Sequence, residues 1–217
     1  MDLNRHGIID LNAPRHTFKY QPINKYSLLN LENNQLWASH PSEFNDPFEF
    51  KFTQIGKNLT KNEIDQFIHD IDKFKVVCLS QDPANILMWS HYADFHKGMC
   101  LGFYHETLTY AVNYSDEFPR IDFKNNDPKL RGLQMYRVIH SKSKQWEYEK
   151  ERRITLTPGT RSEQTYPGEL FLIIFGLRTP IEDIRKVRSR IKDPSVIFWQ
   201  CKYIANQYNL GFGLAPE

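Results

Sequence analysis

Three glutamates alternate with other residues in the stretch that follows Trp146. They are Glu147, Glu149 and Glu151. If this stretch is extended, the three carboxylates lie on one face, about 6 to 7 Å apart. Such a row is either a solvated edge screened by neighbouring Lys and Arg, or a site where a fixed anion binds a hydroxyl or stabilises positive charge developing on a sugar ring. Glu149 and Glu151 are our catalytic candidates, although a one-residue change of register exchanges the faces.

A second set of titratable residues lies in the segment 87–96, which contains His91, Tyr92, Asp94 and His96. Histidine shuttles protons near neutral pH and also ligates metals. The two histidines are five residues apart, so they do not share a face of a regular helix, which disfavours a metal site. The alternative is that the aromatic residues of this segment are core. His91 is a third catalytic candidate, and no metal is expected.

Basic residues gather late in the chain, where they include Arg178, Arg185, Arg188 and Arg190. Cations are favoured near the C-terminal end of a helix, so this pattern has a purely structural explanation. The functional alternative is a contact with nucleic acid. The whole chain has 28 basic and 26 acidic residues, and this near balance gives no argument for polyanion binding.

The composition indicates one core and excludes several classes of protein. With 217 residues and 40% hydrophobic content, the chain has material for one sizeable core. It has neither a membrane-length apolar run nor a signal-like N-terminus, so we expect a cytoplasmic protein that does not enter a membrane. Its three cysteines are far apart and predict neither a disulfide framework nor a zinc site. Phosphate loops, Gly-x-Gly-x-x-Gly and nucleophile elbows are absent.

These candidates need secondary structure to position them. Periodicity and turn chemistry predict strands at 18–20, 35–39, 75–80, 99–104, 109–114, 152–157 and 169–175, and a strand with a short helix in 196–214. They predict helices at 25–31, after Thr60, from Asp82-Pro83 to about residue 95, at 128–140 after Asp127, and after Thr179. Thr60-Glu63 and Thr179-Glu182 have the spacing of capping boxes. Asn45-Asp46-Pro47 predicts a loop anchored by buried aromatic rings on both sides.

The irregular alternation predicts an α+β fold with a mixed, mostly antiparallel sheet and flanking helices. We expect a single domain over residues 1–217. Residues 1–17 are an extension, residues 18–157 hold the main motifs, and residues 158–217 add strands and a helix.

Four of these motifs together resemble a bacterial family known as domain of unknown function 2971. They are Lys19-Tyr20, Phe44-Asn45-Asp46-Pro47-Phe48, Leu87–Ala93 with His96-Lys97-Gly98, and Lys144 with Trp146–Arg152. In that family an arginine usually follows the Lys-Tyr pair, whereas this chain has Gln21.

The order of these features is also similar to that of the ADP-ribosyltransferase fold. In those enzymes a late glutamate binds the nicotinamide ribose of NAD and supports an oxocarbenium-like transition state. The resemblance implies that Glu149 or Glu151 has this role and that NAD is a substrate. It implies NAD contacts from a set of polar residues: Tyr20, Gln21, Asn45, Asp46, Ser80 and Tyr92.

Three functions remain open. The first is an NAD-using transferase or glycohydrolase, in a defence or toxin context. The second is a nucleic-acid-binding module or nuclease that uses His91, Asp94, His96 and the late arginines. The third is an interaction or sensor module without chemistry. The sequence does not indicate the oligomeric state.

Overall fold

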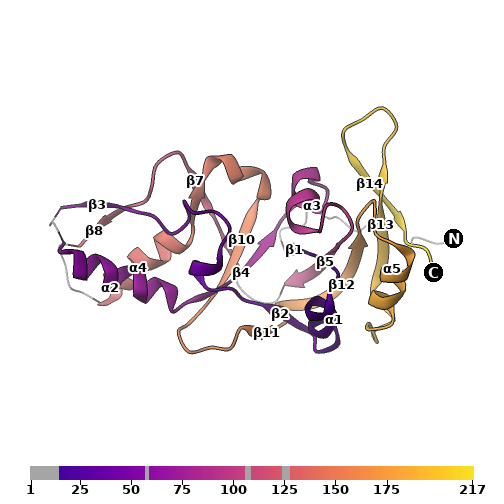
Figure 1. Cartoon of the computed structure of the whole chain (residues 1–217), viewed down its shortest axis with the longest axis horizontal. Coiled ribbons are helices and arrows are strands. Elements are labelled where there is room, and N and C mark those ends of the chain that lie inside the picture. The colour runs from indigo at the N-terminus through magenta and orange to yellow at the C-terminus, as the bar shows by residue number, and fades with distance from the viewer. Residues whose placement is uncertain (1–14, 57–58, 106–108, 124–127) are drawn as a thin grey trace. The chain divides into compact units, whose positions relative to one another are not determined.

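The computed structural model describes residues 15–56, 59–105, 109–123 and 128–217. The chain forms two compact units, the first from residues 1–35, 79–108 and 165–217, the second from residues 36–78 and 109–164. Helices and strands interleave along the chain, which confirms the predicted α+β class (Figure 1). The expectation of a single domain stays a prediction. None of the described helices is long and apolar enough to cross a membrane.

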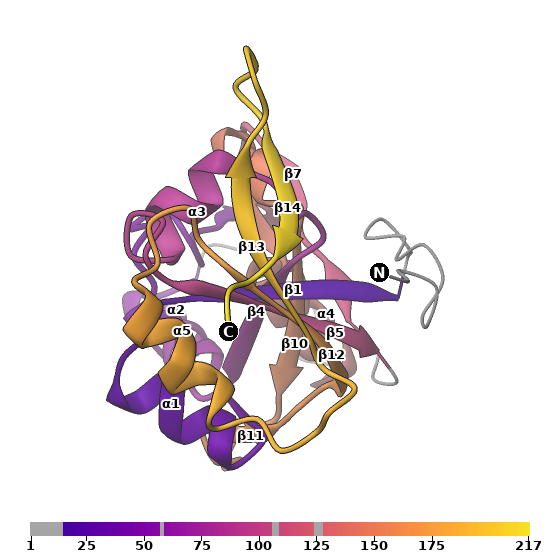
Figure 2. The same cartoon turned by 90° about the vertical axis from the view of Figure 1, so that its right-hand side faces the viewer.

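The first unit is built on a mixed sheet. Across it the strands are β14 (Leu210–Leu214), β13 (Ile197–Tyr203), β12 (Gly168–Phe175), β5 (Met99–His105), β1 (His16–Gln21) and the last residues of β4 (Lys75–Ser80). The β12–β13 pair is parallel, whereas β5 pairs antiparallel with both β1 and β12. The strands expected at 18–20, 75–80, 99–104 and 169–175 are confirmed. The expected helix in the tail is wrong, because β13 and β14 form an antiparallel hairpin there (Figure 2).

Among the described residues of the first unit, the helices are α1 (Lys25–Glu32), α3 (Ile86–Tyr92) and α5 (Ile181–Arg188). The helix α3 is shorter than expected at both ends. Its N-cap is Asn85, whose side chain accepts from the N–H groups of Leu87 and Met88, while the Asp82 carboxylate accepts from Ala84 instead. It stops at Tyr92 because the next residues turn into the left-handed region, with φ of 45°, 51° and 69° at Asp94, Phe95 and His96.

The predicted capping box of α5 is wrong as well. Pro180 is the N-cap and makes no side-chain cap bond, because the Thr179 hydroxyl donates to the Gly98 carbonyl at 2.9 Å. Gly98 lies in a crowded place, where a Cβ would come within 2.4 Å of the Gln21 carbonyl oxygen. Only glycine therefore allows this approach of the Gly98 and Gln21 backbones.

The described part of the second unit contains short strands, the α-helices α2 and α4, and two 3-10 helices. Its elements are the remainder of β2 (Gln35–Trp37), η2 (Pro41–Glu43), β3 (Thr53–Ile55), α2 (Lys61–Asp72), most of β4, β6 (Tyr110–Ala111), β7 (Asn113–Ser115), β8 (Arg120–Asp122), α4 (Pro128–Ile139), β9 (Ser141–Ser143), η3 (Lys144–Glu149), β10 (Glu151–Leu156) and most of β11 (Glu163–Thr165). The strand order is β4-β10-β6, and β3–β8 and β7–β9 are parallel pairs. The expected strand at 109–114 is divided into β6 and β7. The expected cap Asp127 lies outside the described residues.

The helix α2 and its core follow the sequence pattern closely. Thr60 is the N-cap, and its hydroxyl and backbone exchange bonds with Glu63 as in a capping box. Phe67 and Ile71 are buried in a cluster with Val76 of β4 and with residues of β8 and α4. The second unit therefore has its own apolar core.

The capping box gives a first testable result. We expect Thr60→Ala to lower the free energy of unfolding by about 1 kcal/mol, because the N–H of Glu63 loses its acceptor. Urea denaturation followed by circular dichroism measures this loss. Glu63→Gln keeps an acceptor for the Thr60 N–H and is expected to cost less than half as much. Equal losses for the two variants would contradict this account.

Candidate functional site

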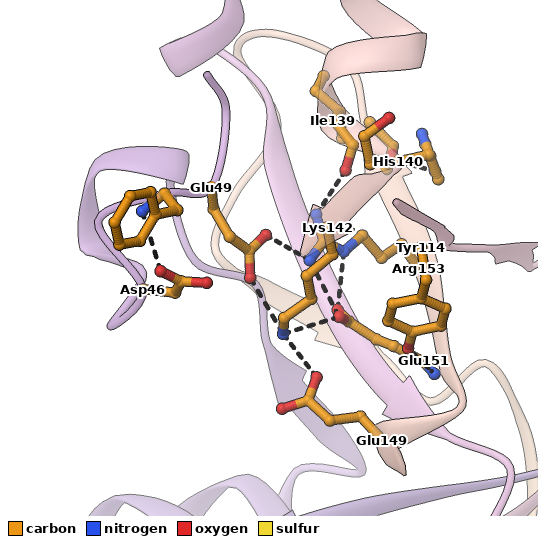
Figure 3. Close-up of polar contacts among 12 residues, drawn as sticks. Asp46, Glu49, Tyr114, Ile139, His140, Lys142, Glu149, Glu151 and Arg153 are labelled. Atoms are coloured by element: carbon orange, nitrogen blue, oxygen red, sulfur yellow. Dashed lines mark hydrogen bonds and ion pairs between the residues drawn. The ribbon is translucent and has the colours of Figure 1, made fainter. Parts of the chain in front are cut away.

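Five charged side chains are buried together in the second unit. This buried ion cluster consists of Glu49, Lys142, Glu149, Glu151 and Arg153, and none of these residues is more than 8% exposed. Glu49 comes from the loop after η2, Lys142 from β9, Glu149 from the end of η3, and the other two from β10 (Figure 3). Buried charges persist only when they are paired, so the geometry of the pairs decides what the cluster can do.

Arg153 binds two carboxylates at once. Its Nε lies 2.7 Å from Glu151 Oε1, and one terminal nitrogen lies 2.5 Å from Glu49 Oε2 and 3.0 Å from Glu151 Oε2. The other terminal nitrogen donates to the Ile139 carbonyl. The rings of Phe44 and Phe50 lie 5.3 and 5.7 Å from the guanidinium carbon and shield it from water. The hydrogen bonds from Arg153 to Glu49 and Glu151 are strong because both partners are charged and shielded from water.

Lys142 lies between three carboxylates. Its Nζ is 2.5 Å from Glu149 Oε2, 3.0 Å from Glu49 Oε1 and 3.1 Å from Glu151 Oε2. Burial lowers the pKa of this ammonium, but the attraction of Glu151, Glu49 and Glu149 outweighs burial and raises the pKa well above the ordinary value. Among the described residues no group of His, Cys, Asp and Glu is arranged to hold a metal ion, and here an ammonium fills the centre of the carboxylates.

Glu151 is ionised, and both of its carboxylate oxygens bind cationic side chains. Burial alone would raise its pKa, but Arg153 and Lys142 outweigh burial and lower the pKa to about 2. Its backbone N–H donates to the Tyr114 hydroxyl at 2.7 Å. At neutral pH this carboxylate neither donates a proton nor has an oxygen directed at solvent. The three carboxylates and two cations leave one surplus negative charge in the cluster.

The structure separates the three alternating glutamates. The condition of an extended stretch does not hold over Lys144–Glu149, which forms the 3-10 helix η3, and Lys150 ends it in the left-handed region with φ 45°. Glu147 is therefore exposed, whereas Glu149 and Glu151 are buried. The catalytic role expected for these two glutamates stays a prediction.

The Asn45-Asp46-Pro47 loop is ordered by a carboxylate rather than by rings on both sides. Asp46 is 8% exposed, and its Oδ1 accepts from the Phe48 N–H at 2.9 Å. Asn45 is exposed, and Phe48, which we expected to be buried, is 65% exposed. Asp46 and Glu49 occupy the buried positions of the loop, so the Phe48 ring is exposed and accessible to a ligand.

The other expected NAD contacts belong to the first unit. The Tyr20 hydroxyl donates to the Asp82 carbonyl at 2.6 Å, and its ring packs edge-on against Trp89. The Ser80 hydroxyl accepts from the Asp82 N–H at 3.0 Å. Gln21 has a buried amide nitrogen without an acceptor among the described residues. Tyr20 and Ser80 thus have structural partners.

The histidine segment is also in the first unit. His91 is exposed and its ring lies 6.2 Å from that of Tyr92. His96 Nε2 lies 3.1 Å from the Ser90 hydroxyl, and burial lowers the pKa of His96, helped by Arg178. Asp94 is exposed. The chemical role of His91 stays a prediction.

The late arginines are only partly available to a polyanion. Arg188 stacks on Phe198 at 4.4 Å and donates to a backbone carbonyl, and Arg190 pairs with Glu32. Arg178 and Arg185 are exposed. Nucleic-acid binding through these residues stays a prediction.

A pocket of about 270 Å³ borders the ion cluster. We call it the Phe48 pocket, and its lining consists of Phe48, Phe50, Lys51, Ser115, Asp116, Glu117, Phe118, Pro119, Ser141, Lys142, Ser143 and Gln145. Phe118 is 43% exposed, like Phe48 an apolar ring left at the surface. Lys142 belongs both to this wall and to the ion cluster. The cluster therefore connects the loop carrying Phe48 to β9, which carries Ser141 and Ser143.

Sequence reasoning missed three members of the cluster: Glu49, Lys142 and Arg153. A signal existed for Arg153, because Glu149, Glu151 and Arg153 alternate like residues on one face of a strand. Glu49 had none, since it is 104 residues from its partner Arg153.

No family model matches the chain, and no curated protein or solved structure matches it significantly. Membership of the family of unknown function and likeness to ADP-ribosyltransferases therefore stay predictions, and the functional argument depends on the geometry of the second unit.

Proposed function

We propose that the second unit binds a small ring compound of the nucleoside class, with NAD as the first candidate, in the Phe48 pocket. The observation that carries this proposal is the pair of exposed rings, Phe48 and Phe118, in the wall of a pocket that also presents polar side chains. Apolar surface combined with a few convergent polar groups is typical of small-molecule sites.

The size of the pocket favours one nucleoside moiety. Ligand pockets usually enclose about 300 to 1,000 Å³, so a pocket of about 270 Å³ is at the small end. A nicotinamide riboside or adenosine half fits this size better than an entire dinucleotide. The flat base of a nucleoside is attracted to a phenyl ring in either a stacked or an edge-to-face arrangement.

The polar walls match the sugar. Ser141 and Ser143 carry hydroxyls, and Asp116 carries a carboxylate, which is the group that commonly accepts from ribose hydroxyls. Lys51 adds an ammonium that attracts a phosphate. These groups would orient a nucleoside with its base on the phenyl rings and its sugar toward β9.

The ion cluster has a positioning role in this proposal. Glu49 and Lys142 are paired with each other, and they come from two of the segments that line the pocket. A site whose supporting residues are locked by buried pairs needs little reorganisation when the ligand arrives. Glu149 and Glu151 act through Lys142 and Arg153, because their oxygens already bind these cations.

Isothermal titration of NAD, nicotinamide riboside and adenosine into the protein tests the proposal. We expect Phe48→Ala and Phe118→Ala each to weaken binding by about 1–3 kcal/mol, the usual effect of removing one stacking ring. Tyr208→Ala is the matched control, because Tyr208 is 98% exposed in the other unit. Undetectable binding of all three compounds, or wild-type affinity in both phenylalanine variants, would exclude the proposal. Nicotinamide release in the NAD samples shows whether the bound ligand is cleaved.

A further inference from the structure

A second, open pocket of about 790 Å³ lies in the same unit. We call it the Asp46 pocket, and its lining consists of Pro41, Ser42, Phe44, Asp46, Pro47, Glu49, Phe50, Lys51, Phe52, Gln54, Ile64, Asp65, Ile68, His69, Ile71 and Asp72. It is formed by the 41–54 segment and α2. Only Phe50 and Lys51 line both this pocket and the Phe48 pocket.

The wall of the Asp46 pocket is negatively charged. Four carboxylates line it against one ammonium, that of Lys51. Glu49 is neutralised by Lys142 and Arg153, and Asp72 accepts from the Ser42 N–H at 2.9 Å. Negative charge still exceeds positive charge, and the adjacent ion cluster adds its own surplus carboxylate. Such a wall attracts cations and repels anions.

Asp46 has an oxygen that lacks a partner. Its Oδ1 accepts from the Phe48 N–H, whereas its Oδ2 is buried and has no hydrogen-bond donor among the described residues. A buried carboxylate oxygen without a donor is costly, and a cationic donor that reaches it recovers that cost. Asp46 lines the pocket, so a ligand that displaces the atoms covering Oδ2 can supply the donor.

Much of the remaining wall is apolar. Ile64 and Ile68 of α2 line this pocket together with Phe44 and Phe52 of the loop segment, and Ile68 is 49% exposed. A metal ion would gain nothing from such a surface, because hard cations need a shell of oxygen ligands. An alkyl or aryl group would gain free energy from leaving water there.

We infer that the Asp46 pocket binds an organic cation, with its ammonium group at the Asp46 carboxylate and its apolar body against Ile64 and Ile68. The inference uses a different pocket from the nucleoside proposal and does not depend on it. The ammonium supplies the missing donor, and the apolar body covers the exposed isoleucine.

The test compares two probes of nearly equal shape, benzylammonium and the neutral benzyl alcohol, by isothermal titration. We expect the wild-type protein to bind benzylammonium at least about tenfold more tightly, a difference of about 1.4 kcal/mol. Asp46→Asn is expected to abolish that preference. Asparagine keeps the Oδ1 acceptor for the Phe48 N–H, so the turn is preserved.

Two further variants make the result decisive. Ile68→Arg places a cation and extra volume at a half-exposed position of the pocket, and we expect it to block benzylammonium without unfolding α2. Asp116→Asn and Phe118→Ala, in the Phe48 pocket, are expected to leave benzylammonium binding unchanged. Equal affinity for the two probes, undiminished binding in Asp46→Asn and Ile68→Arg, or no binding at millimolar concentration would overturn the inference.

Discussion

Arg153→Met is expected to destabilise the second unit by about 3–5 kcal/mol, the usual cost of removing one partner of a buried ion pair. The guanidinium is fully buried and neutralises Glu49 and Glu151. Methionine fills part of the volume but leaves three buried carboxylates facing the single ammonium of Lys142. The Ile139 carbonyl also loses a donor. Because Glu49 anchors the loop that carries Phe48, nucleoside binding is expected to fall with stability.

Urea denaturation of the wild type and the variant, followed by circular dichroism, measures this effect. Arg120→Met is the matched control, because Arg120 pairs with Glu117 at the surface of the same unit, where the two side chains are 65% and 73% exposed. Its cost is expected to be about 0–1 kcal/mol. An Arg153→Met protein as stable as Arg120→Met would show that the ion cluster does not support the unit.

Glu151→Gln is expected to remove a large part of the acid sensitivity of the protein. The pKa of Glu151 is about 2 in the folded chain against an ordinary value of 4.5, because Arg153 and Lys142 outweigh the effect of burial. A carboxyl whose folded pKa is depressed stabilises the fold fully above its unfolded pKa. That stabilisation is lost as pH falls from about 4.5 toward 2. The shift corresponds to about 3 kcal/mol.

Urea midpoints measured from neutral pH down to about pH 3 test this expectation. The wild type is expected to lose stability steeply below about pH 4.5, whereas Glu151→Gln starts less stable at neutral pH and loses less on acidification. Asp70→Asn is the control. Hydrogen bonds from Lys73 and Arg131 also lower the pKa of Asp70 to about 2, but this carboxylate is near the surface, where solvent screens its pairs. The same acid sensitivity in Glu151→Gln and in the wild type would refute the assignment.

Several elements followed from local signals in the sequence. The Thr60-Glu63 box and the apolar spacing after it predicted α2, and β-branched runs predicted β4 and β12. Such signals are reliable because the hydrogen bonds and side-chain periodicities that form these elements act over a few residues. The same local reasoning identified Glu149 and Glu151 as unusual, since charges that alternate on a strand require a compensating environment.

Other local signals were overridden by competing partners. The Thr179 hydroxyl was expected to cap α5 but donates to the Gly98 carbonyl, 81 residues away in the chain. Asp82 was expected to begin α3, but Asn85 caps it. At α5 a tertiary contact takes the hydroxyl that was expected to cap the helix, whereas at α3 the nearby Asn85 is the cap and the Asp82 carboxylate binds the Ala84 N–H.

The sequence by itself determined the α+β class, most of the elements and the presence of an unusual carboxylate pair. Only the tertiary structure decided that this pair is buried against Lys142 and Arg153, that Glu49 completes the cluster, and that Phe48 is exposed beside a pocket. The physical reason is the range of the interactions. Helices and strands depend on neighbours within a few residues, whereas the partner of a buried charge is chosen by packing between segments up to 104 residues apart.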